Sequence, residues 1–213
     1  MIETNRRVSL ICMVFVMALL LTACSSSEKS VSSGGSTTAA AKTLNATICA
    51  GYVSEAGSSA VAEQLKEMLG GDVNVSVACI STTSEDPMMQ MTSIMKITMG
   101  IAAREIDIVI ADAENAARNA RSEAFCPLSD LLSEEQIAAL GDKALSFDMV
   151  DEDGKPTGER TSICGIDITD SGITDDVIAG KTNVGLFVVS NAPNMERYKI
   201  LINTVAENLR GKQ

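Results

Sequence analysis

The stretch that most constrains the fold is residues 106–132, IDIVIADAENAARNARSEAFCPLSDLL. It opens with a short apolar run rich in β-branched side chains, which is typical of a buried strand. Asp112 ends this run and can cap a helix that begins at Ala113 and is rich in alanine and arginine. Pro127 follows the helix and cannot continue it. This order of strand, acidic cap, helix and proline-led turn predicts one unit of an α/β sheet.

The preceding chain repeats the alternation of strand and helix twice. Residues 43–50 predict a first strand, and Ser54 can cap the helix that follows it. Residues 73–80 predict a second strand, and Asp86 can cap a helix over residues 87–104. Alternating strands and helices imply right-handed crossovers with helices on both faces. We therefore expect an α/β fold with a mostly parallel sheet in three layers.

The helix expected over residues 87–104 carries methionines at steps of three and four: Met88, Met91, Met95 and Met99. One interpretation is a pliable face that binds a partner, because methionine side chains adapt to irregular surfaces. The other is that the stripe packs on the sheet. The helical spacing favours packing on the sheet.

The C-terminal third continues the same pattern of elements. Ser133 and Gln136 predict a capping box at the start of a short helix. Residues 151–154, DEDG, predict a hairpin turn. Residues 184–190 predict a last buried strand, and a closing helix with one apolar face follows Pro193.

The N-terminus has the three parts of an export signal: Arg6 and Arg7, an apolar run over residues 8–20, and small residues before Cys24. The apolar run is too short to predict a transmembrane helix, so a cleaved signal is the better interpretation. The sequence Leu-Thr-Ala-Cys ending at Cys24 resembles the bacterial lipobox, in which the cysteine thiol takes a diacylglyceryl group before cleavage. The alternative is an ordinary signal peptide with an accidental cysteine.

Three regions follow from these patterns: a lipoprotein signal peptide over residues 1–23, a Ser/Gly-rich tether over residues 24–42, and one lobe over residues 43–213. The formal net charge is −11, and it becomes −12 without residues 1–23, which contain two arginines and one glutamate. An acidic surface argues against nucleic acid and against anionic lipid head groups. We therefore expect the lipid on Cys24 to hold the protein on the extracytoplasmic face of the cell membrane.

No metal or cofactor site is expected. The chain contains no histidine and no CxxC motif, which excludes the usual zinc sites. If Gly154 were the central glycine of an EF-hand loop, Met149 and Arg160 would be the first and last ligands, and neither can bind calcium. There is also no P-loop and no G-x-S-x-G motif, so we do not expect an enzyme.

The order of these elements resembles the first lobe of extracellular solute-binding proteins, the receptors of ABC importers. In that family the chain crosses to a second lobe through a segment like residues 164–167, and it returns as a strand and helix like residues 184–209. Only sixteen residues, 168–183, stand where the second lobe would be, which is too short for a domain. The resemblance therefore implies a periplasmic-binding-protein-like fold with a single lobe and no hinge to close.

The resemblance also bears on the cysteines. Cys49 and Cys79 lie in strand-like runs, where a buried free thiol is expected. In the family, the regions of Cys126 and Cys164 lie near one another, which makes a disulfide between them possible. The alternative is four reduced cysteines, because spacing alone does not determine connectivity.

A ligand site in an open α/β sheet lies beyond the carboxyl ends of the strands. The candidates are Tyr52, Ser54 and Glu55 after the first strand, Thr82 and Thr83 after the second, Asp112, Glu114 and Asn115 after the third, Asp167 at the crossover and Asn191 after the last strand. Helix capping alone would also explain Ser54 and Asp112.

The expected function is binding without catalysis. The lobe would bind a small solute or a transporter component such as an ABC permease. The alternative is a non-transporting protein of the cell envelope that uses the lobe for protein–protein contacts. Sugars are disfavoured as ligands, because sugar-binding members of the family stack their ligand on aromatic rings, and this chain has no Trp, two Tyr and four Phe.

Overall fold

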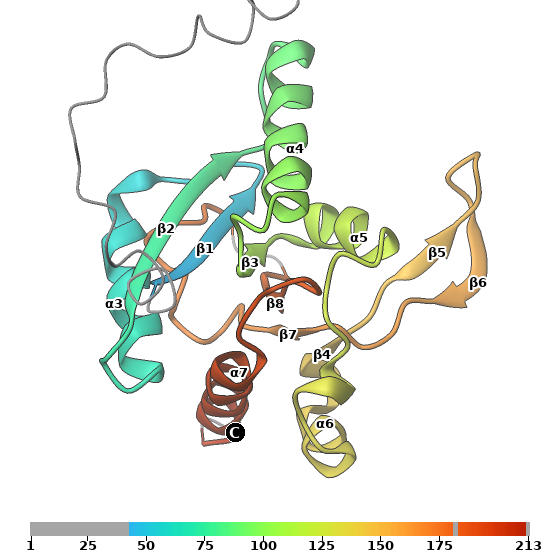
Figure 1. The fold of residues 1–213 in the computed structure, drawn as a ribbon. Helices are drawn as coiled ribbons and strands as arrows, with labels where there is room; N and C mark the ends of the chain where they lie inside the picture. The colour runs from blue at the N-terminus through green and yellow to red at the C-terminus, as the bar shows by residue number, and fades with distance from the viewer. Residues whose placement is uncertain (1–42, 181–182, 212–213) are drawn as a thin grey trace, which may run out of the picture. The chain divides into compact units, whose positions relative to one another are not determined.

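The computed structural model describes residues 43–180 and 183–211, and these belong to one compact unit (Figure 1). The expected signal peptide, the expected lipidation at Cys24 and the expected tether all fall on residues outside the described ranges. The described part is a mixed α/β fold built on a six-stranded sheet with the order β2-β1-β3-β8-β7-β4.

One half of this sheet is parallel, as the sequence predicts. β1 (Thr43–Ala50) pairs in parallel with β2 (Asn74–Ser81) on one side and with β3 (Ile108–Ala111) on the other. All four residues of β3 are buried, as expected from its apolar run. We call these three strands the parallel half.

The other half is antiparallel, so the expectation of a mostly parallel sheet is wrong. It contains β8 (Gly185–Val188), β7 (Gly165–Asp167) and β4 (Ala144–Leu145). Each of the pairs β3–β8, β8–β7 and β7–β4 is antiparallel. A parallel neighbour needs a long crossover, usually a helix. The chain between β7 and β8 forms no helix among its described residues and returns beside β7, so β8 runs the opposite way.

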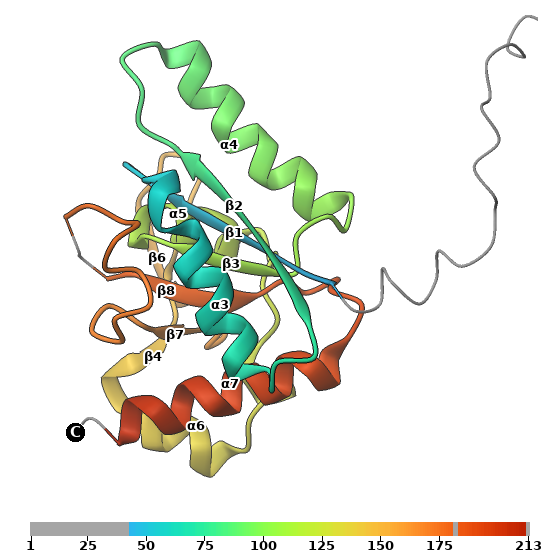
Figure 2. The same cartoon turned by 90° about the vertical axis from the view of Figure 1, so that its left-hand side faces the viewer.

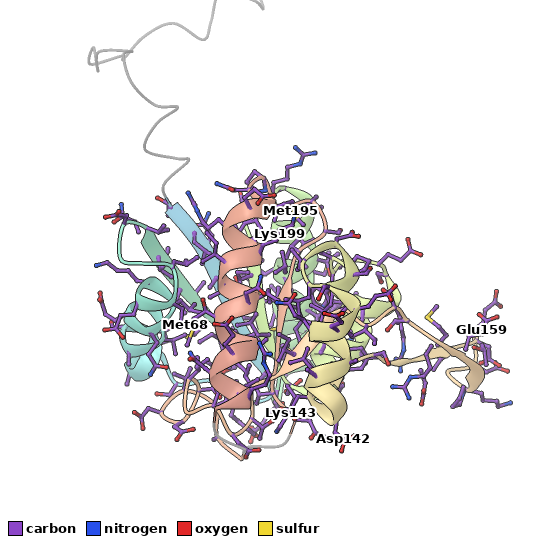
Figure 3. All side chains as sticks on the ribbon, turned by 90° about the horizontal axis from the view of Figure 1, so that it is seen from below. Met68, Asp142, Lys143, Glu159, Met195 and Lys199 are labelled. Carbon is purple, nitrogen blue, oxygen red and sulfur yellow. The ribbon has the colours of Figure 1, made fainter. Side chains whose placement is uncertain are left out.

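Helices lie on both faces of the sheet, as expected (Figures 1 and 2). α3 (Ser58–Met68), α6 (Glu134–Leu140) and α7 (Met195–Arg210) share one face, and Figure 3 shows α7 between α3 and α6. The Nε2 atom of Gln136 on α6 donates a hydrogen bond to Oδ1 of Asn203 on α7, at 2.6 Å. α6 also begins with the predicted capping box of Ser133 and Gln136.

Two helices lie on the opposite face: α4 (Pro87–Ala102) and α5 (Ala113–Arg121). Both begin at the predicted aspartates, since the Asp86 side chain accepts a hydrogen bond from the backbone N–H of Met88, and Asp112 caps α5. Three short 3₁₀ helices connect the larger elements: η1 (Glu55–Gly57), η2 (Leu128–Asp130) and η3 (Gly141–Lys143).

The methionines of α4 do not pack on the sheet, so that prediction is wrong. The buried residues of α4 are Ile97, Gly100 and Ile101, all near its C-terminal end. A Cβ at Gly100 would come within 2.7 Å of the Ile106 side chain, so glycine allows the helix to approach the sheet there. The N-terminal half of α4 projects past the ends of the neighbouring strands (Figure 1).

A separate two-stranded hairpin projects from the antiparallel side (Figure 1). It contains β5 (Asp148–Val150) and β6 (Pro156–Arg160), joined by the predicted acidic turn. Gly154 in this turn has a φ of +78°, a left-handed conformation that glycine adopts without steric cost.

Candidate ligand-binding site

The carboxyl ends of β1 and β3 are joined by the side chain of Asp112. Its Oδ1 accepts a hydrogen bond from the backbone N–H of Asn115 at 3.0 Å, which caps α5. Its Oδ2 accepts one from the backbone N–H of Gly51 at 2.8 Å, just after β1. Both carboxylate oxygens are therefore engaged within the protein, and Asp112 acts here as a cap and as a tie between two strands.

A buried polar network extends from Asp112 toward β2. The Nδ2 atom of Asn115 donates to Oγ1 of Thr82 at 2.9 Å and to Oδ1 of Asp112 at 2.8 Å. Arg118 donates to Oδ1 of Asn115 at 3.2 Å and forms an ion pair with Glu114 at 3.0 Å. Thr82 and Asn115 are both buried. Thr82 and Asn115 therefore bond within the edge of the sheet, while Glu114 and Arg118 form a partly exposed ion pair beside them.

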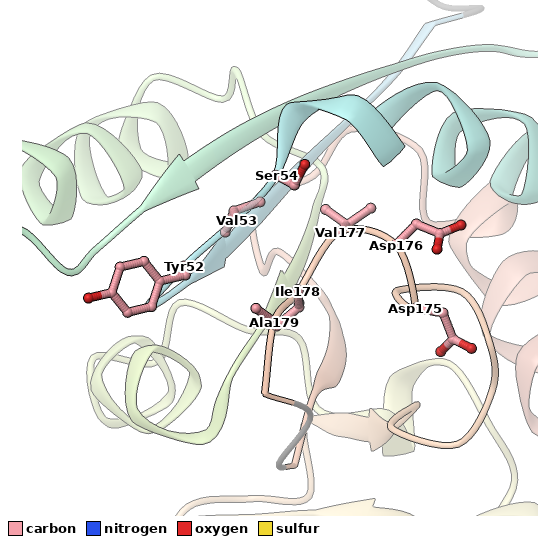
Figure 4. Close-up of a pocket in the computed structure, with 8 residues that line it drawn as sticks. All are labelled: Tyr52, Val53, Ser54, Asp175, Asp176, Val177, Ile178 and Ala179. Atoms are coloured by element: carbon pink, nitrogen blue, oxygen red, sulfur yellow. The ribbon is translucent and has the colours of Figure 1, made fainter.

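Beside this network lies a shallow pocket of about 320 Å³ (Figure 4). Tyr52, Val53 and Ser54 form one wall, directly after β1, and residues 175–179 form the other. The close-up shows Tyr52 at one end of the pocket, with Asp175 and Asp176 at the other. We call this the edge pocket.

The second wall of the edge pocket comes from the segment that stands where a second lobe would be. Val53 forms a β-bridge with Ile178, and the Ser54 N–H donates to the carbonyl of Val177 at 2.8 Å. A Cβ on Gly57 would come within 2.6 Å of Val177, so glycine is needed for this approach. The polar, glycine-containing sequence of residues 168–183 is typical of a surface loop. Three apolar residues of this segment are buried and could have indicated the contact: Ile173, Val177 and Ile178.

The charge around the edge pocket is acidic. Asp175 and Asp176 are exposed at its rim, and its lining within the described part of the chain contains no lysine or arginine. Tyr52 is 67% exposed, so a ligand can reach its side chain. The floor is apolar, with Val53, Val177 and Ile178 in the lining. A pocket with these properties attracts cations and contacts apolar groups.

The ten candidate residues separate into groups in the structure. Tyr52 and Ser54 line the edge pocket, and the Ser54 side chain caps the 3₁₀ helix η1, whereas the expected helix, α3, begins after Gly57 without a side-chain cap. Glu55 lies beside them on η1 and is exposed. The Thr83 N–H donates to the carbonyl of Gly51 at 3.1 Å. Thr82, Asp112, Glu114 and Asn115 belong to the polar network described above.

Asp167 lies at the same edge of the sheet, but on the other side of β8. Its Oδ1 accepts hydrogen bonds from the N–H and hydroxyl of Thr169, and its Oδ2 is 3.3 Å from Nζ of Lys143. Burial alone would raise the pKa of Asp167, but the hydrogen bonds from Thr169 and Lys143 outweigh it, and the pKa is lowered. Asp167 is therefore part of a structural ion pair.

Asn191 lies at the opposite edge, so its inclusion in the site was wrong. Its Nδ2 donates to the carbonyl of Ile101 at the end of α4, at 2.9 Å. Nearby, the Val189 N–H donates to the carbonyl of Asp107, just before β3, at 3.0 Å. Because β8 runs antiparallel to β3, the end of β8 lies where β3 begins.

The four domain cysteines are free thiols in the structure, so the possible Cys126–Cys164 disulfide is not formed in it. The two segments do lie side by side, since the Leu128 N–H donates to the carbonyl of Ile163 at 2.8 Å. Burial raises the pKa of Cys126 and of Cys164 to about 11, and that of Cys49 to about 12. These thiols remain protonated near neutral pH and are poor nucleophiles.

A second cavity of about 470 Å³ lies between α5 and the projecting hairpin, and no sequence pattern predicted it. Phe125 and Cys164 belong to its buried lining, and Arg121 and Arg160 are at its rim. Arg121 binds the hairpin, since its Nε donates to the carbonyl of Asp148 at 2.9 Å, and Arg160 on β6 donates to the carbonyl of Ser146, before β5, at 2.6 Å. No sequence pattern indicated this cavity, because the lining segments are distant along the chain.

No family model, no curated protein and no solved structure matches this chain. Within residues 43–180 and 183–211, no helix is long and apolar enough to cross a membrane. In the same part of the chain, no cluster of three His, Cys, Asp or Glu side chains is placed to share a metal ion.

Proposed function

We propose that this protein is a lipid-anchored lipoprotein on the extracytoplasmic face of the membrane, whose periplasmic-binding-protein-like lobe binds a small solute without catalysis. The leader ending at Cys24 supports the anchor. The observation that carries the binding role is the edge pocket, which lies beyond the carboxyl end of β1. The return of the chain through β8 and α7 also agrees with the resemblance to solute-binding proteins.

The solute is a small organic cation with an apolar part. Asp175 and Asp176 place negative charge at one end of the edge pocket, and the exposed Tyr52 ring at the other end can contact a cation through its face. The apolar lining between them suits a short hydrocarbon chain. Anions are disfavoured because the described lining residues include no basic side chain and the net charge of the chain is −11.

Affinity is expected to be weak. The pocket volume of about 320 Å³ is near the lower limit of typical ligand pockets, and the pocket is open to solvent. A single lobe contacts one side of the solute and has no second lobe to close over it. Such a protein fits a role in collecting a solute close to the membrane, for an ABC permease or another envelope protein to receive.

The local chemistry supports binding without catalysis. The two carboxylate oxygens of Asp112 are held by Gly51 and Asn115, and the Glu114 carboxylate is paired with Arg118. A general acid or base needs a group that reaches the substrate. The carboxylates of the edge pocket are exposed at its rim, and their role in the proposal is to attract positive charge.

The test is a thermal-shift screen of the full-length chain against matched organic cations, anions and neutral compounds, followed by calorimetry on the best hits. Cations with an apolar part should raise the melting temperature, and Tyr52→Ala and Asp176→Asn should each weaken their binding. Glu159→Gln, in the lining of the second cavity, is the matched control and should leave binding unchanged. In parallel, Cys24→Ala should release the protein from the membrane fraction.

The binding proposal is wrong if anions bind as well as cations, or if Tyr52→Ala and Asp176→Asn leave the affinity unchanged. Small-angle scattering provides a further check. Because no second lobe is present to close, the best ligand should leave the radius of gyration unaltered, and ligand-dependent compaction would contradict the single-lobe mechanism.

A further inference from the structure

Helix α4 has two apolar faces, and only one of them is buried. Ile97, Gly100 and Ile101 face the sheet. The opposite side of the helix presents Met88, Met91, Met95 and Met99, which are 72%, 61%, 50% and 65% exposed. We call these four residues the methionine face. Apolar side chains so exposed along three turns of one helix are unusual for a protein surface.

The two apolar faces of α4 carry different residues. The buried face uses isoleucine, and the exposed face uses methionine. Five of the eleven methionines of the sequence lie within residues 88–99. An apolar surface alone could be made from leucine, which forms helices equally well. What methionine adds is a flexible side chain with a thioether sulfur.

The spacing allows neighbouring sulfur atoms to meet. Residues three or four apart on a helix have Cβ atoms about 5–6 Å from one another. Three such pairs lie along the methionine face: Met88–Met91, Met91–Met95 and Met95–Met99. Each sulfur lies two bonds beyond its Cβ atom on an exposed side chain, so the two sulfurs of a pair can contact one ion above the helix surface. Met91 and Met95 each belong to two of the three pairs.

We propose that the methionine face binds a soft monovalent metal ion, Cu(I). Thioether sulfur is a soft, uncharged ligand that selects Cu(I) over harder divalent ions. α4 contains no carboxylate and the chain contains no histidine, so harder ions find no ligands on this helix. The net charge of −11 favours the approach of any cation.

The charged residue within α4, Lys96, does not belong to the methionine face. It follows Met95 by one position, which turns it about 100° around the helix. Its ammonium group is exposed and screened by water.

Thiols are the main competitors for a soft ion, and the structure separates them from the methionine face. Cys49, Cys126 and Cys164 are buried, and burial keeps them protonated. Cys79 is partly exposed on β2. Blocking accessible thiols with N-ethylmaleimide therefore leaves the thioethers as the soft ligands at the surface.

The experiment is an NMR titration of the thiol-blocked, full-length chain, labelled with ¹³C in the methionine methyl groups, in chloride-free buffer. Ag(I) is the probe, because it has the ligand preference of Cu(I) without its redox chemistry. We expect the methyl signals of Met88, Met91 and Met95 to shift together and saturate, with Met99 following. Met89, which is 63% exposed on the same helix but outside the stripe, should not shift. Zn(II) should have no effect.

Substitution of methionine by leucine distinguishes sulfur chemistry from hydrophobicity. Met91→Leu/Met95→Leu removes at least one sulfur from each of the three pairs and retains the apolar surface. It should weaken Ag(I) binding by more than about tenfold, a loss that even outer-shell changes cause at metal sites. Met89→Leu is the matched control and should bind as the wild type does.

Two results would overturn the metal site. In the first, all methionine methyl groups, Met89 included, shift in parallel without saturation. In the second, the leucine variant binds Ag(I) as tightly as the wild type. Sedimentation of both proteins completes the test: self-association that survives the leucine substitutions, without specific Ag(I) binding, would identify the methionine face as a hydrophobic contact between copies instead.

Discussion

The parallel half of the sheet buries many aliphatic side chains of similar size, whereas the antiparallel half is organised around one aromatic ring. In the parallel half, Leu44 and Ile48 on β1 and Ile110 on β3 are fully buried. In the antiparallel half, the strands are four residues long or shorter, and the Phe187 ring is buried among them.

Phe187 has neighbours that leave room for its ring. A Cβ added to Gly185, or to Gly165, the cross-strand partner of Phe187, would collide with this ring. The ring stacks on Phe125 with centroids 4.5 Å apart, and the Phe147 ring lies 6.1 Å away. All three phenylalanines of the described residues therefore meet here. Because one side chain here fills the space of several, a single substitution should lower the unfolding free energy more in this half than in the parallel half.

The two halves also differ in how far apart along the chain their paired strands lie. Each strand of the parallel half is followed by a helix, and β1 pairs with the next two strands along the chain. The antiparallel half joins β4, β7 and β8 through an intervening hairpin and the segment that covers the edge pocket. Three predictions test how far this difference in construction is also a difference in stability.

The largest effect is expected for Phe187→Ala. Removal of a fully buried phenylalanine costs about 3–5 kcal/mol of unfolding free energy, through lost transfer energy and the cavity that remains. Ile48→Val in the parallel half should cost only about 0.5–1.5 kcal/mol. Urea denaturation followed by circular dichroism measures both. Equal losses for the two variants would contradict the proposed difference between the halves.

A second substitution keeps this prediction testable and shows whether the ring itself is responsible. Gly165→Ala should destabilise the wild type by about 1–3 kcal/mol, because its Cβ would meet the Phe187 ring. In the Phe187→Ala background the same change should cost much less, since the space is open. If Phe187→Ala does not fold, Phe187→Leu replaces it in the cycle. Additive losses would mean that the glycine is needed for another reason.

An intermediate effect is expected for Asp112→Ala in the parallel half. The substitution removes the cap of α5 and also leaves the Gly51 N–H without its partner. The cost should be about 2 kcal/mol, at the upper end of the range for a helix cap. Ser133→Ala removes the cap of the short α6 and should cost less, about 1 kcal/mol. A larger loss for Ser133→Ala would contradict the role of Asp112 as a tie between β1 and β3.

The smallest effect is the pH dependence contributed by Asp167. Its pKa is lowered in the folded state, so its stabilising contribution is present above the unfolded pKa of about 3.9 and is lost as the pH falls through the folded pKa. Asp167→Asn should therefore flatten the decline of unfolding free energy below about pH 4. Asp153→Asn, at an exposed ion pair with Lys155, should leave that decline as it is.

The candidate site shows which predictions from sequence hold. Tyr52 and Ser54 line the edge pocket, because a loop that directly follows a buried strand must emerge at its carboxyl end. Asn191 was placed at the same edge on the same rule, but the rule requires the direction of the strand. β8 is antiparallel to β3, and strand direction depends on pairing with distant residues. The wall formed by residues 175–179 was missed because its contacts are with Val53 and Ser54, far along the chain.

The sequence by itself determined the three strands of the parallel half, the caps at Asp86, Asp112 and Ser133, and the turn at Gly154. Each of these depends on neighbouring residues: a capping side chain bonds a backbone N–H two or three positions on, and a glycine adopts its own φ angle. Local interactions of this kind can be predicted from a few consecutive residues.

Only the tertiary structure decided which way β8 runs, and which face of α4 is buried. The helical period places Ile97 and Ile101 on one side and the methionine face on the other, but both sides are apolar. The choice between them depends on where the sheet lies, and the close approach at Gly100 brings the isoleucine side inward. Because burial is a property of the assembled fold, a period in the sequence defines the faces of a helix but does not tell which one meets water.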